Sequence, residues 1–176
     1  MTLLVCGGAA SGKSAYAEEM LCRLSGDAPR VYLATMRPEG EEASARIGKH
    51  RARRAGLGFE TRECFTDLLN AAIPPDSAVL LEDIGNLCAN ELFDPAGSGE
   101  NAADAVVRGA ETLAGRCRCQ VIVTNEVCSG GTDYAGDTLR YLRVLAEVNR
   151  RLAALADGVC EVVCGLAEYY KGEETA

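Results

Sequence analysis

The feature that most constrains the fold is a short apolar run followed at once by a glycine-rich loop ending in Lys-Ser. Residues 3–6 are Leu-Leu-Val-Cys, and residues 7–14 are Gly-Gly-Ala-Ala-Ser-Gly-Lys-Ser. This order matches G-x-x-x-x-G-K-[ST], which predicts a buried strand, a phosphate-binding loop and then a helix. Glycines let backbone N–H groups point at an anion, and the helix N-terminus adds partial positive charge. The motif therefore predicts a nucleotide-phosphate site at the start of the chain.

Two positions of the motif have specific chemical roles. Lys13 is expected to reach the β- and γ-phosphates as a catalytic cation, and the Ser14 hydroxyl is expected to bind Mg²⁺. The phosphates are expected to lie on the whole loop, which comprises Gly7, Gly8, Ala9, Ala10, Ser11, Gly12, Lys13 and Ser14.

Apolar runs alternate with helix-like segments along the chain. Strands are predicted at 2–6, 30–35, 78–82, 120–125 and 159–164. Most of these runs are continuously apolar, as expected when helices cover both faces of a parallel sheet. Helical spacing of apolar residues marks two further segments, with Ala17, Met20, Leu21 and Leu24 in one and Leu145, Val148, Leu152 and Leu155 in the other. The pattern predicts an α/β fold of the P-loop nucleotide-binding kind, with a doubly wound, mostly parallel sheet.

Length and charge restrict the possible functions. The 176 residues fit one domain, 1–176, and a net charge of −8 argues against general binding to nucleic acid or an anionic membrane. No membrane-spanning run or signal peptide is recognisable, which favours a location in the cytoplasm.

The nine cysteines lack C-x-x-C spacing and are interpreted as reduced and mostly structural. Four of them lie in apolar patterns: Cys6, Cys22, Cys160 and Cys164. Loops are predicted at 94–100 and 130–136, and a frayed tail at 171–176.

Acidic residues close one of the predicted strands. Glu82 and Asp83 follow an apolar run, and the carboxyl ends of parallel strands gather ligands at one edge of a sheet. There Glu82 is expected to hold Mg²⁺ or to accept a proton from a substrate hydroxyl. The alternative is a solvated acidic pair at the start of a helix. We favour the functional role, and Glu82 over Asp83.

The only histidine, His50, lies in a basic segment, residues 45–54. If this segment is helical, one face carries Arg46, Lys49, His50 and Arg53. These side chains repel one another unless an anion binds there, although a solvated basic face is the ordinary alternative. Positive neighbours disfavour protonation of the imidazole and keep its lone pair available for attack on a nucleotide α-phosphate.

Six motifs in this order carry a family resemblance: Gly7-Gly-Ala-x-Ser-Gly-Lys-Ser, Tyr32-Leu-Ala-Thr35, Arg46-Ile-x-x-His50-Arg-x-Arg-Arg54, Thr61-x-Glu63, Val123-Thr-Asn-Glu-Val127 and Asn149-x-x-Leu-Ala-x-x-Ala-Asp157. Together they resemble the bifunctional adenosylcobinamide kinase/adenosylcobinamide-phosphate guanylyltransferase family of cobalamin biosynthesis. The resemblance implies phosphorylation of adenosylcobinamide by a nucleoside triphosphate, GTP or ATP. It then implies transfer of GMP from GTP through a guanylyl-histidine, with Mg²⁺.

The resemblance also implies a set of site residues and an assembly. His50 matches the guanylylated histidine, and a homotrimer is expected. Besides the phosphate loop, the positions expected around GTP are Ala34, Thr35, Met36, Arg51, Ala52, Arg53, Arg54, Glu63 and Glu82. Glu63 is a hypothetical acceptor for the guanine N1–H and amino group.

The sequence departs from the family pattern in two places. Cys128-Ser-Gly-Gly-Thr-Asp133 replaces a Gly-Ile-Val-Pro stretch, and Arg143-Val-Leu-Ala-Glu147 replaces Arg-Asp-x-x-Gly, which adds charge where an anion is expected to approach. Two alternative functions therefore stay open. One is another P-loop small-molecule kinase that uses the basic segment as a phosphate clamp, and the other is a GTP-binding paralogue without turnover.

Overall fold

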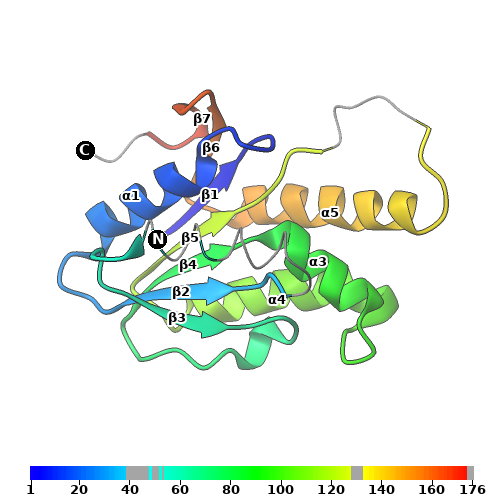
Figure 1. Cartoon of the computed structure of the whole chain (residues 1–176), viewed down its shortest axis with the longest axis horizontal. Coiled ribbons are helices and arrows are strands. Elements are labelled where there is room, and N and C mark those ends of the chain that lie inside the picture. Colours follow the sequence, from blue (N-terminus) through cyan, green and yellow to red (C-terminus); the bar gives the residue numbers. More distant parts are fainter. Residues whose placement is uncertain (39–47, 49–51, 53, 128–132, 174–176) are drawn as a thin grey trace.

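The computed structural model describes residues 1–38, 48, 52, 54–127 and 133–173. Seven strands in this part of the chain form one sheet in the order β3-β2-β4-β5-β1-β6-β7 (Figure 1). All neighbouring pairs are parallel except β6 and β7. The strands are β1 (Thr2–Cys6), β2 (Arg30–Ala34), β3 (Phe59–Glu63), β4 (Ala78–Glu82), β5 (Cys119–Val123), β6 (Gly158–Val163) and β7 (Leu166–Lys171).

Helices cover both faces of this sheet (Figure 1). Helix α1 (Lys13–Ser25) packs on one face through an apolar cluster that includes Ala17, Met20 and Leu21. The other face is covered by α3 (Ile84–Phe93), α4 (Ala102–Ala114) and α5 (Gly136–Leu155), with short turns η1 (Leu68–Asn70) and η2 (Gly99–Asn101) beside them. Strands β4 and β5 are buried throughout because they lie in the middle of this sandwich. The predicted doubly wound α/β architecture is confirmed.

The sequence prediction missed both edge strands. β3 reads Phe-Glu-Thr-Arg-Glu and β7 reads Leu-Ala-Glu-Tyr-Tyr-Lys, and both are largely solvent-facing. An edge strand is exposed on one side of its ladder and needs no continuous apolar run, so its pattern is weak. The assignment of Lys171 to a frayed tail was wrong, because this residue ends β7. The five predicted strands are confirmed: 2–6 and 78–82 have the predicted ends, and the ends of the other three differ by at most two residues.

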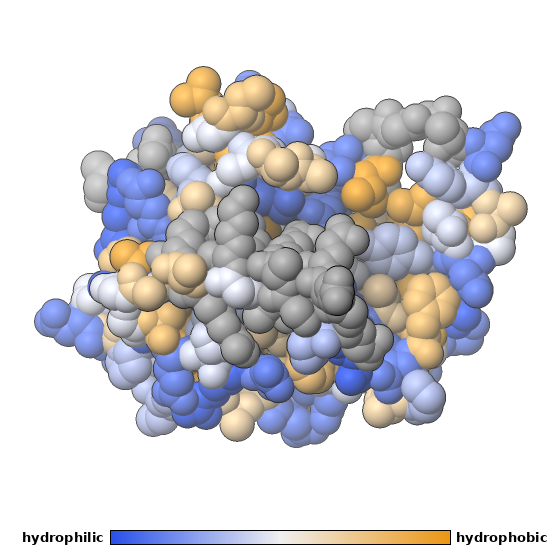
Figure 2. All heavy atoms as spheres, in the orientation of Figure 1, coloured by the Kyte–Doolittle hydropathy of each residue, from blue (hydrophilic) through white to orange (hydrophobic). Residues whose placement is uncertain are grey.

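Two predicted core positions are also corrected. Leu155 is the last residue of α5 and is half exposed, whereas Leu145, Val148 and Leu152 are buried as predicted. Cys164 is exposed in the β6–β7 turn with a positive φ of 52°. Figure 2 shows apolar side chains over this hairpin, where Val163, Leu166 and Tyr170 are exposed.

The buried cysteines behave as predicted. No disulfide joins the cysteines among the described residues. Burial raises the pKa of the Cys64 thiol to about 11 and that of Cys88 to about 12, so both stay protonated near neutral pH and pack as small apolar groups. In the same described part of the chain, none of the helices is long and apolar enough to cross a membrane.

The predicted loops lie where connections are needed. Residues 94–98 form turns between α3 and η2, which confirms most of the loop expected at 94–100. The loop expected at 130–136 lies partly outside the described residues, and α5 already begins at Gly136.

Candidate functional site

The phosphate loop connects β1 to α1 and is tied to the β6–β7 hairpin. The backbone N–H of Gly165 donates a hydrogen bond to the Ser11 carbonyl at 2.8 Å, and a Cβ added to Gly12 would lie 3.1 Å from the Gly165 Cα. Gly12 also has a φ of 96°, a conformation that a side chain disfavours. Position 12 therefore requires a glycine, both because of its backbone conformation and because it packs closely on Gly165.

Substitution of Gly7 by alanine is expected to destabilise the protein. A Cβ at Gly7 would lie 2.7 Å from the Val162 carbonyl oxygen, so the backbone of the loop or of β6 must shift, at a cost of about 1–3 kcal/mol in the free energy of unfolding. Gly8→Ala is the matched control, because no atom lies within 4 Å of its added Cβ. Urea unfolding of both variants measures the difference. Equal stability of the two would contradict this account.

The charged and hydroxyl groups of the motif converge at the start of α1. Lys13 is buried, and its Nζ donates a hydrogen bond to the Gly8 carbonyl at 3.1 Å. The ammonium therefore lies over the loop that is expected to hold the phosphates. The Ser14 hydroxyl donates a hydrogen bond to Oε1 of Glu82.

Glu82 reaches the phosphate loop from a strand that is not adjacent to β1. Strand β5 lies between β1 and β4, and Glu82 is the last residue of β4. Helix α1 packs across β5 and β4, so it carries Ser14 to the buried Glu82 carboxylate. A hydroxyl and a carboxylate oxygen at one point are the hard ligands that Mg²⁺ prefers. This donor pair fits Mg²⁺, and Ser14 and Glu82 are the residues that would hold it.

The two neighbouring acids have different roles. Asp83 is the N-cap of α3, and its Oδ1 accepts a hydrogen bond from the Asn86 N–H at 2.6 Å. Asp83 therefore starts a helix, as the alternative interpretation states, but it is buried and not solvated. The Thr35 hydroxyl donates to the Asp83 carbonyl at 2.8 Å and accepts from the Asp83 N–H at 2.7 Å. The Thr35 side chain thus fixes the backbone that follows Glu82.

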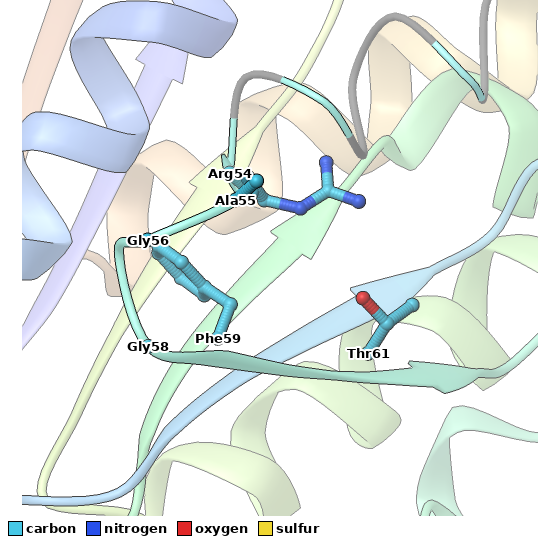
Figure 3. A pocket seen from close by; sticks show the side chains of 6 residues that line it. All are labelled: Arg54, Ala55, Gly56, Gly58, Phe59 and Thr61. Atoms are coloured by element: carbon cyan, nitrogen blue, oxygen red, sulfur yellow. The ribbon is translucent and has the colours of Figure 1, made fainter.

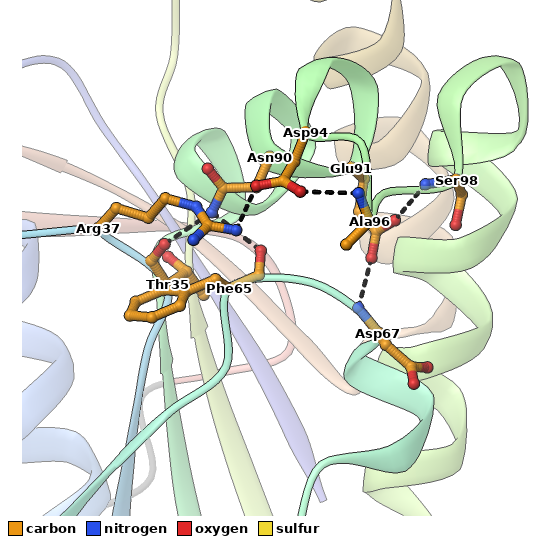
Figure 4. A network of polar contacts seen from close by, with 9 residues as sticks. All are labelled: Thr35, Arg37, Phe65, Asp67, Asn90, Glu91, Asp94, Ala96 and Ser98. Atoms are coloured by element: carbon orange, nitrogen blue, oxygen red, sulfur yellow. Dashed lines mark hydrogen bonds and ion pairs between the residues drawn. The ribbon is translucent and has the colours of Figure 1, made fainter. Parts of the chain in front are cut away.

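A polar network joins the ends of β2 and β3 to helix α3 (Figure 4). The Asn90 side-chain amide donates to the carbonyls of Thr35 and Phe65, each at 2.9 Å. The Arg37 guanidinium pairs with Asp94 and lies 4.9 Å from the centre of the Phe65 ring. Nearby, buried Glu91 accepts hydrogen bonds from the N–H groups of Asp67 and Ser98. The network holds the carboxyl ends of both strands in place, and the sequence reasoning missed it.

The end of β5 is anchored to the phosphate loop and to α5. The Glu126 N–H donates to the Gly7 carbonyl at 3.1 Å. The Thr124 hydroxyl donates to Oδ1 of Asn149 at 2.6 Å, and the Asn149 amide donates to the Asn125 carbonyl at 3.2 Å. Asn149 therefore positions this loop. Glu147, the charged residue of the departure at 143–147, pairs at 3.3 Å with Arg151 on α5.

A cavity of about 400 Å³ lies on the α1-facing side of edge strand β3 (Figure 3). Its lining is formed by Arg54, Ala55, Gly56, Gly58, Phe59 and Thr61. Residues two apart on a strand share a face, so Glu63 continues the row of Phe59 and Thr61 to the carboxyl edge of the sheet. The Glu63 side chain is exposed there.

Arg54 has an unusual position at this cavity. Its side chain is 5% exposed, lies 3.7 Å from Glu18 and is stacked 3.4 Å from the centre of the Tyr32 ring. Among the described residues, its Nε and Nη1 have no hydrogen-bond partner. A buried cation with unused donors is costly unless an anion completes its hydrogen bonds, which makes Arg54 a candidate phosphate ligand.

The remaining predicted site residues are only partly placed. Ala34, Thr35 and Met36 lie at the end of β2, at the same sheet edge as Glu82 and Glu63. Ala52 is exposed. Three predicted site residues lie outside the described residues: His50, Arg51 and Arg53. The same holds for Arg46 and Lys49 of the predicted basic face, and for residues 128–132 of the departure from the family pattern.

Comparisons with solved structures agree with this architecture. The ATPase domain of G40P matches 91% of this chain and 68% of its own, with a TM-score of 0.50 and 10% identity. The flagellar accessory protein FlaH from Methanocaldococcus jannaschii matches 97% of this chain and 77% of its own, with a TM-score of 0.53 and 11% identity. Because the identities are this low, the two matches concern the fold alone, and they agree with the doubly wound α/β architecture.

Sequence comparisons are more specific. The bifunctional adenosylcobalamin biosynthesis protein CobU of Salmonella typhimurium is 36% identical over 181 residues, covering 94% of this chain and 97% of the relative. The protein of the same name from Escherichia coli is 34% identical over 180 residues, with the same coverage. A family model described as cobinamide kinase / cobinamide phosphate guanyltransferase matches residues 3–169. The chain belongs to this family of enzymes.

Proposed function

We propose that this chain phosphorylates adenosylcobinamide with a nucleoside triphosphate and then transfers GMP from GTP to the new phosphate, giving adenosyl-GDP-cobinamide. The observation that carries the proposal is the convergence of Lys13, Ser14 and Glu82 on one phosphate loop, in a chain whose relatives are named for adenosylcobalamin biosynthesis. We treat residues 1–176 as one functional unit.

In the kinase step, the phosphate loop holds the triphosphate and Lys13 moves onto its β- and γ-phosphates. Ser14 and Glu82 hold Mg²⁺, which neutralises charge on the transferred phosphoryl group when it is bound. Catalysis then rests on positioning: the substrate hydroxyl oxygen bonds to the γ-phosphorus, the bond from that phosphorus to the β-phosphate oxygen breaks, the nucleoside diphosphate leaves, and the hydroxyl proton passes to solvent. The Thr35–Asp83 hydrogen bonds support this step because they fix the end of β4.

In the guanylyl step, an imidazole nitrogen of His50 attacks the α-phosphorus of GTP. A P–N bond forms, the bond to the β-phosphate oxygen breaks, and pyrophosphate leaves. The phosphate of the cobinamide intermediate then displaces His50 and takes the GMP group. Arg54, with buried and unused donors, and its neighbours Arg51 and Arg53 are proposed to stabilise the departing charge.

This function is tested by incubating the purified chain with Mg²⁺ and GTP labelled at the α-phosphorus. We expect acid-labile, base-stable label on the protein, which later moves to phosphorylated cobinamide. Absence of protein label with retained phosphorylation of cobinamide would instead support a kinase that uses the basic segment as a clamp. Binding of GTP with neither transfer would support the paralogue without turnover.

Glu63→Gln is expected to reduce the preference for GTP over ATP by about tenfold, because an amide presents one acceptor where the carboxylate presents two to the guanine N1–H and amino groups. The ratio of kcat/KM values for guanylyl and adenylyl transfer measures this preference. Glu60→Gln is the matched control, since Glu60 lies on the same strand, facing away from the cavity, and pairs with Arg62. Unchanged preference in the Glu63 variant would remove the assigned role.

The proposal includes the expected partners and setting. The substrates are GTP or ATP and adenosylcobinamide, and Mg²⁺ is the metal. A homotrimer and a cytoplasmic location, where both triphosphates are available, complete the proposal.

A further inference from the structure

Polar side chains from three elements converge above the first turn of helix α3, around Gly85. A Cβ added to Gly85 would lie 2.7 Å from the Asn125 amide nitrogen and 3.0 Å from the Tyr141 hydroxyl oxygen. It would also lie 3.2 Å from Oδ1 of Asp83. Asn125 follows β5, Tyr141 belongs to α5, and α5 packs against α3. The absence of a side chain at Gly85 therefore leaves the space that the Asn125 amide fills.

This group of side chains lies next to the phosphate loop and the proposed metal ligands. Strand β5 stands between β1, which leads into the loop, and β4, which ends at Glu82. The Glu126 N–H donates a hydrogen bond to the Gly7 carbonyl at 3.1 Å, so the chain at Asn125 runs beside the start of the loop. Because neighbouring strands are about 4.8 Å apart, Asn125 has the loop on one side and the end of β4 on the other.

The chemistry around Gly85 differs from that of the phosphate loop. The loop offers backbone N–H groups and the Lys13 ammonium, which suit an anion. Asn125 and Tyr141 are neutral: an amide nitrogen donates hydrogen bonds, and a phenol hydroxyl both donates and accepts them. The neighbouring Asp83 carboxylate caps α3 and repels a second anion. A neutral alcohol, which also donates and accepts, suits Asn125 and Tyr141 better than a phosphate does.

Asn125 and Tyr141 are held in place and are still open to solvent. Both residues are half-buried, and residues 136–138 at the start of α5 are exposed. Further along, α5 is fixed in the core by Leu145 and Val148. The Asn149 side chain donates to the Asn125 carbonyl at 3.2 Å, which fixes the backbone that carries the Asn125 amide. A substrate can therefore reach side chains whose supporting elements are rigid.

We propose that Asn125 and Tyr141 form the subsite for the acceptor alcohol of the kinase step, and that Gly85 is a positioning residue for it. The Asn125 amide donates a hydrogen bond to the alcohol oxygen, and the Tyr141 hydroxyl accepts one from the alcohol hydrogen. The alcohol oxygen then bonds to the γ-phosphorus, the nucleoside diphosphate leaves, and the proton passes to solvent. This inference rests on the proposed function, since it assigns the place of that reaction's acceptor.

Asn125→Ala tests the subsite by equilibrium dialysis of adenosylcobinamide in the presence of Mg²⁺ and ADP, which cannot react. We expect about tenfold weaker binding, because one hydrogen bond to the alcohol is lost. Alanine keeps the backbone carbonyl that accepts from Asn149. Tyr141→Phe is expected to weaken binding about fivefold for the same reason. Asn70→Ala is the matched control, because the Asn70 amide bonds to Asp67 on the turn η1.

Gly85→Ala tests the positioning role without touching either subsite residue. The added methyl group takes the space of the Asn125 amide, and this flexible side-chain end must move away. We expect about tenfold weaker binding of adenosylcobinamide, with no loss of stability in urea, because alanine favours a helix over glycine. Gly115→Ala, at the end of α4, is the matched control, since its Cβ would meet no atom closer than 3.6 Å.

Nucleotide binding separates a subsite from general damage to the site. Affinity for a fluorescent GTP analogue is expected to be the same in all these variants and the wild type. If the Asn125 and Gly85 variants bind adenosylcobinamide as tightly as their controls, or lose affinity for both ligands equally, the subsite is overturned and the proposed function stands. A wild type that binds no adenosylcobinamide would overturn both. Absence of a GMP adduct alone would overturn the guanylyl step and leave the subsite intact.

Discussion

Replacement of Glu82 by glutamine is expected to lower both phosphorylation of cobinamide and guanylyl transfer by about a hundredfold. Glutamine keeps the shape and the contact with Ser14 but removes the negative charge that the proposed metal site needs. Steady-state rates of each half reaction, measured over a range of Mg²⁺ concentrations, test this expectation.

The adjacent acid is the control for this substitution. Asp83→Asn makes the same chemical change one residue away, and an asparagine oxygen can still accept the hydrogen bond from the Asn86 N–H and cap α3. We expect this variant to keep nearly full activity. If Asp83→Asn lost as much activity as Glu82→Gln, the assignment of the metal site to Glu82 would be wrong.

Replacement of His50 by alanine is expected to abolish the GMP adduct and to slow guanylyl transfer by at least about a thousandfold, because a covalent step has lost its nucleophile. Phosphorylation of cobinamide is expected to continue, since that step needs the phosphate loop and Mg²⁺ alone. Intact-mass measurement after incubation with GTP and Mg²⁺ detects the adduct directly.

Lys13→Ala provides the contrast for the His50 substitution. The Lys13 ammonium lies over the phosphate loop, so its loss is expected to impair both steps. A GMP adduct of unchanged yield in His50→Ala would place the nucleophile elsewhere. Loss of phosphorylation in the same variant would mean that the two reactions are not separable at His50.

Local sequence patterns were sufficient to predict the central strands of the sheet and helices α1 and α5. The central strands are apolar runs because helices cover both of their faces, and α1 and α5 repeat apolar residues at helical spacing. The edge strands β3 and β7 lack such a pattern because one side of each ladder faces solvent. The prediction that Cys164 packs in an apolar pattern failed for a related reason. The apolar run of β6 continues into the turn that follows, where the Cys164 side chain is exposed.

The roles of individual polar residues could not be predicted from sequence patterns alone, because they depend on contacts in the tertiary structure. Sequence favoured Glu82 over Asp83, but only the crossing of α1 over β5 and β4 brings Ser14 to that carboxylate. Arg54 was grouped with Arg51 and Arg53 by family resemblance, and nothing in the spacing indicates that it stacks on Tyr32. Asn90 and Asn149 were not predicted as anchors, because each bonds to backbone groups that are distant in the chain.

The sequence by itself determined the phosphate loop, the parallel α/β sheet and the family, because these depend on residues that are close together or in a fixed order. The tertiary structure alone decided which acid meets Ser14, which arginine is buried, and that this arginine stacks on Tyr32. The physical reason is that these contacts join β2, β4 and α1 across the sheet, where burial strengthens each charge interaction and no local spacing records it.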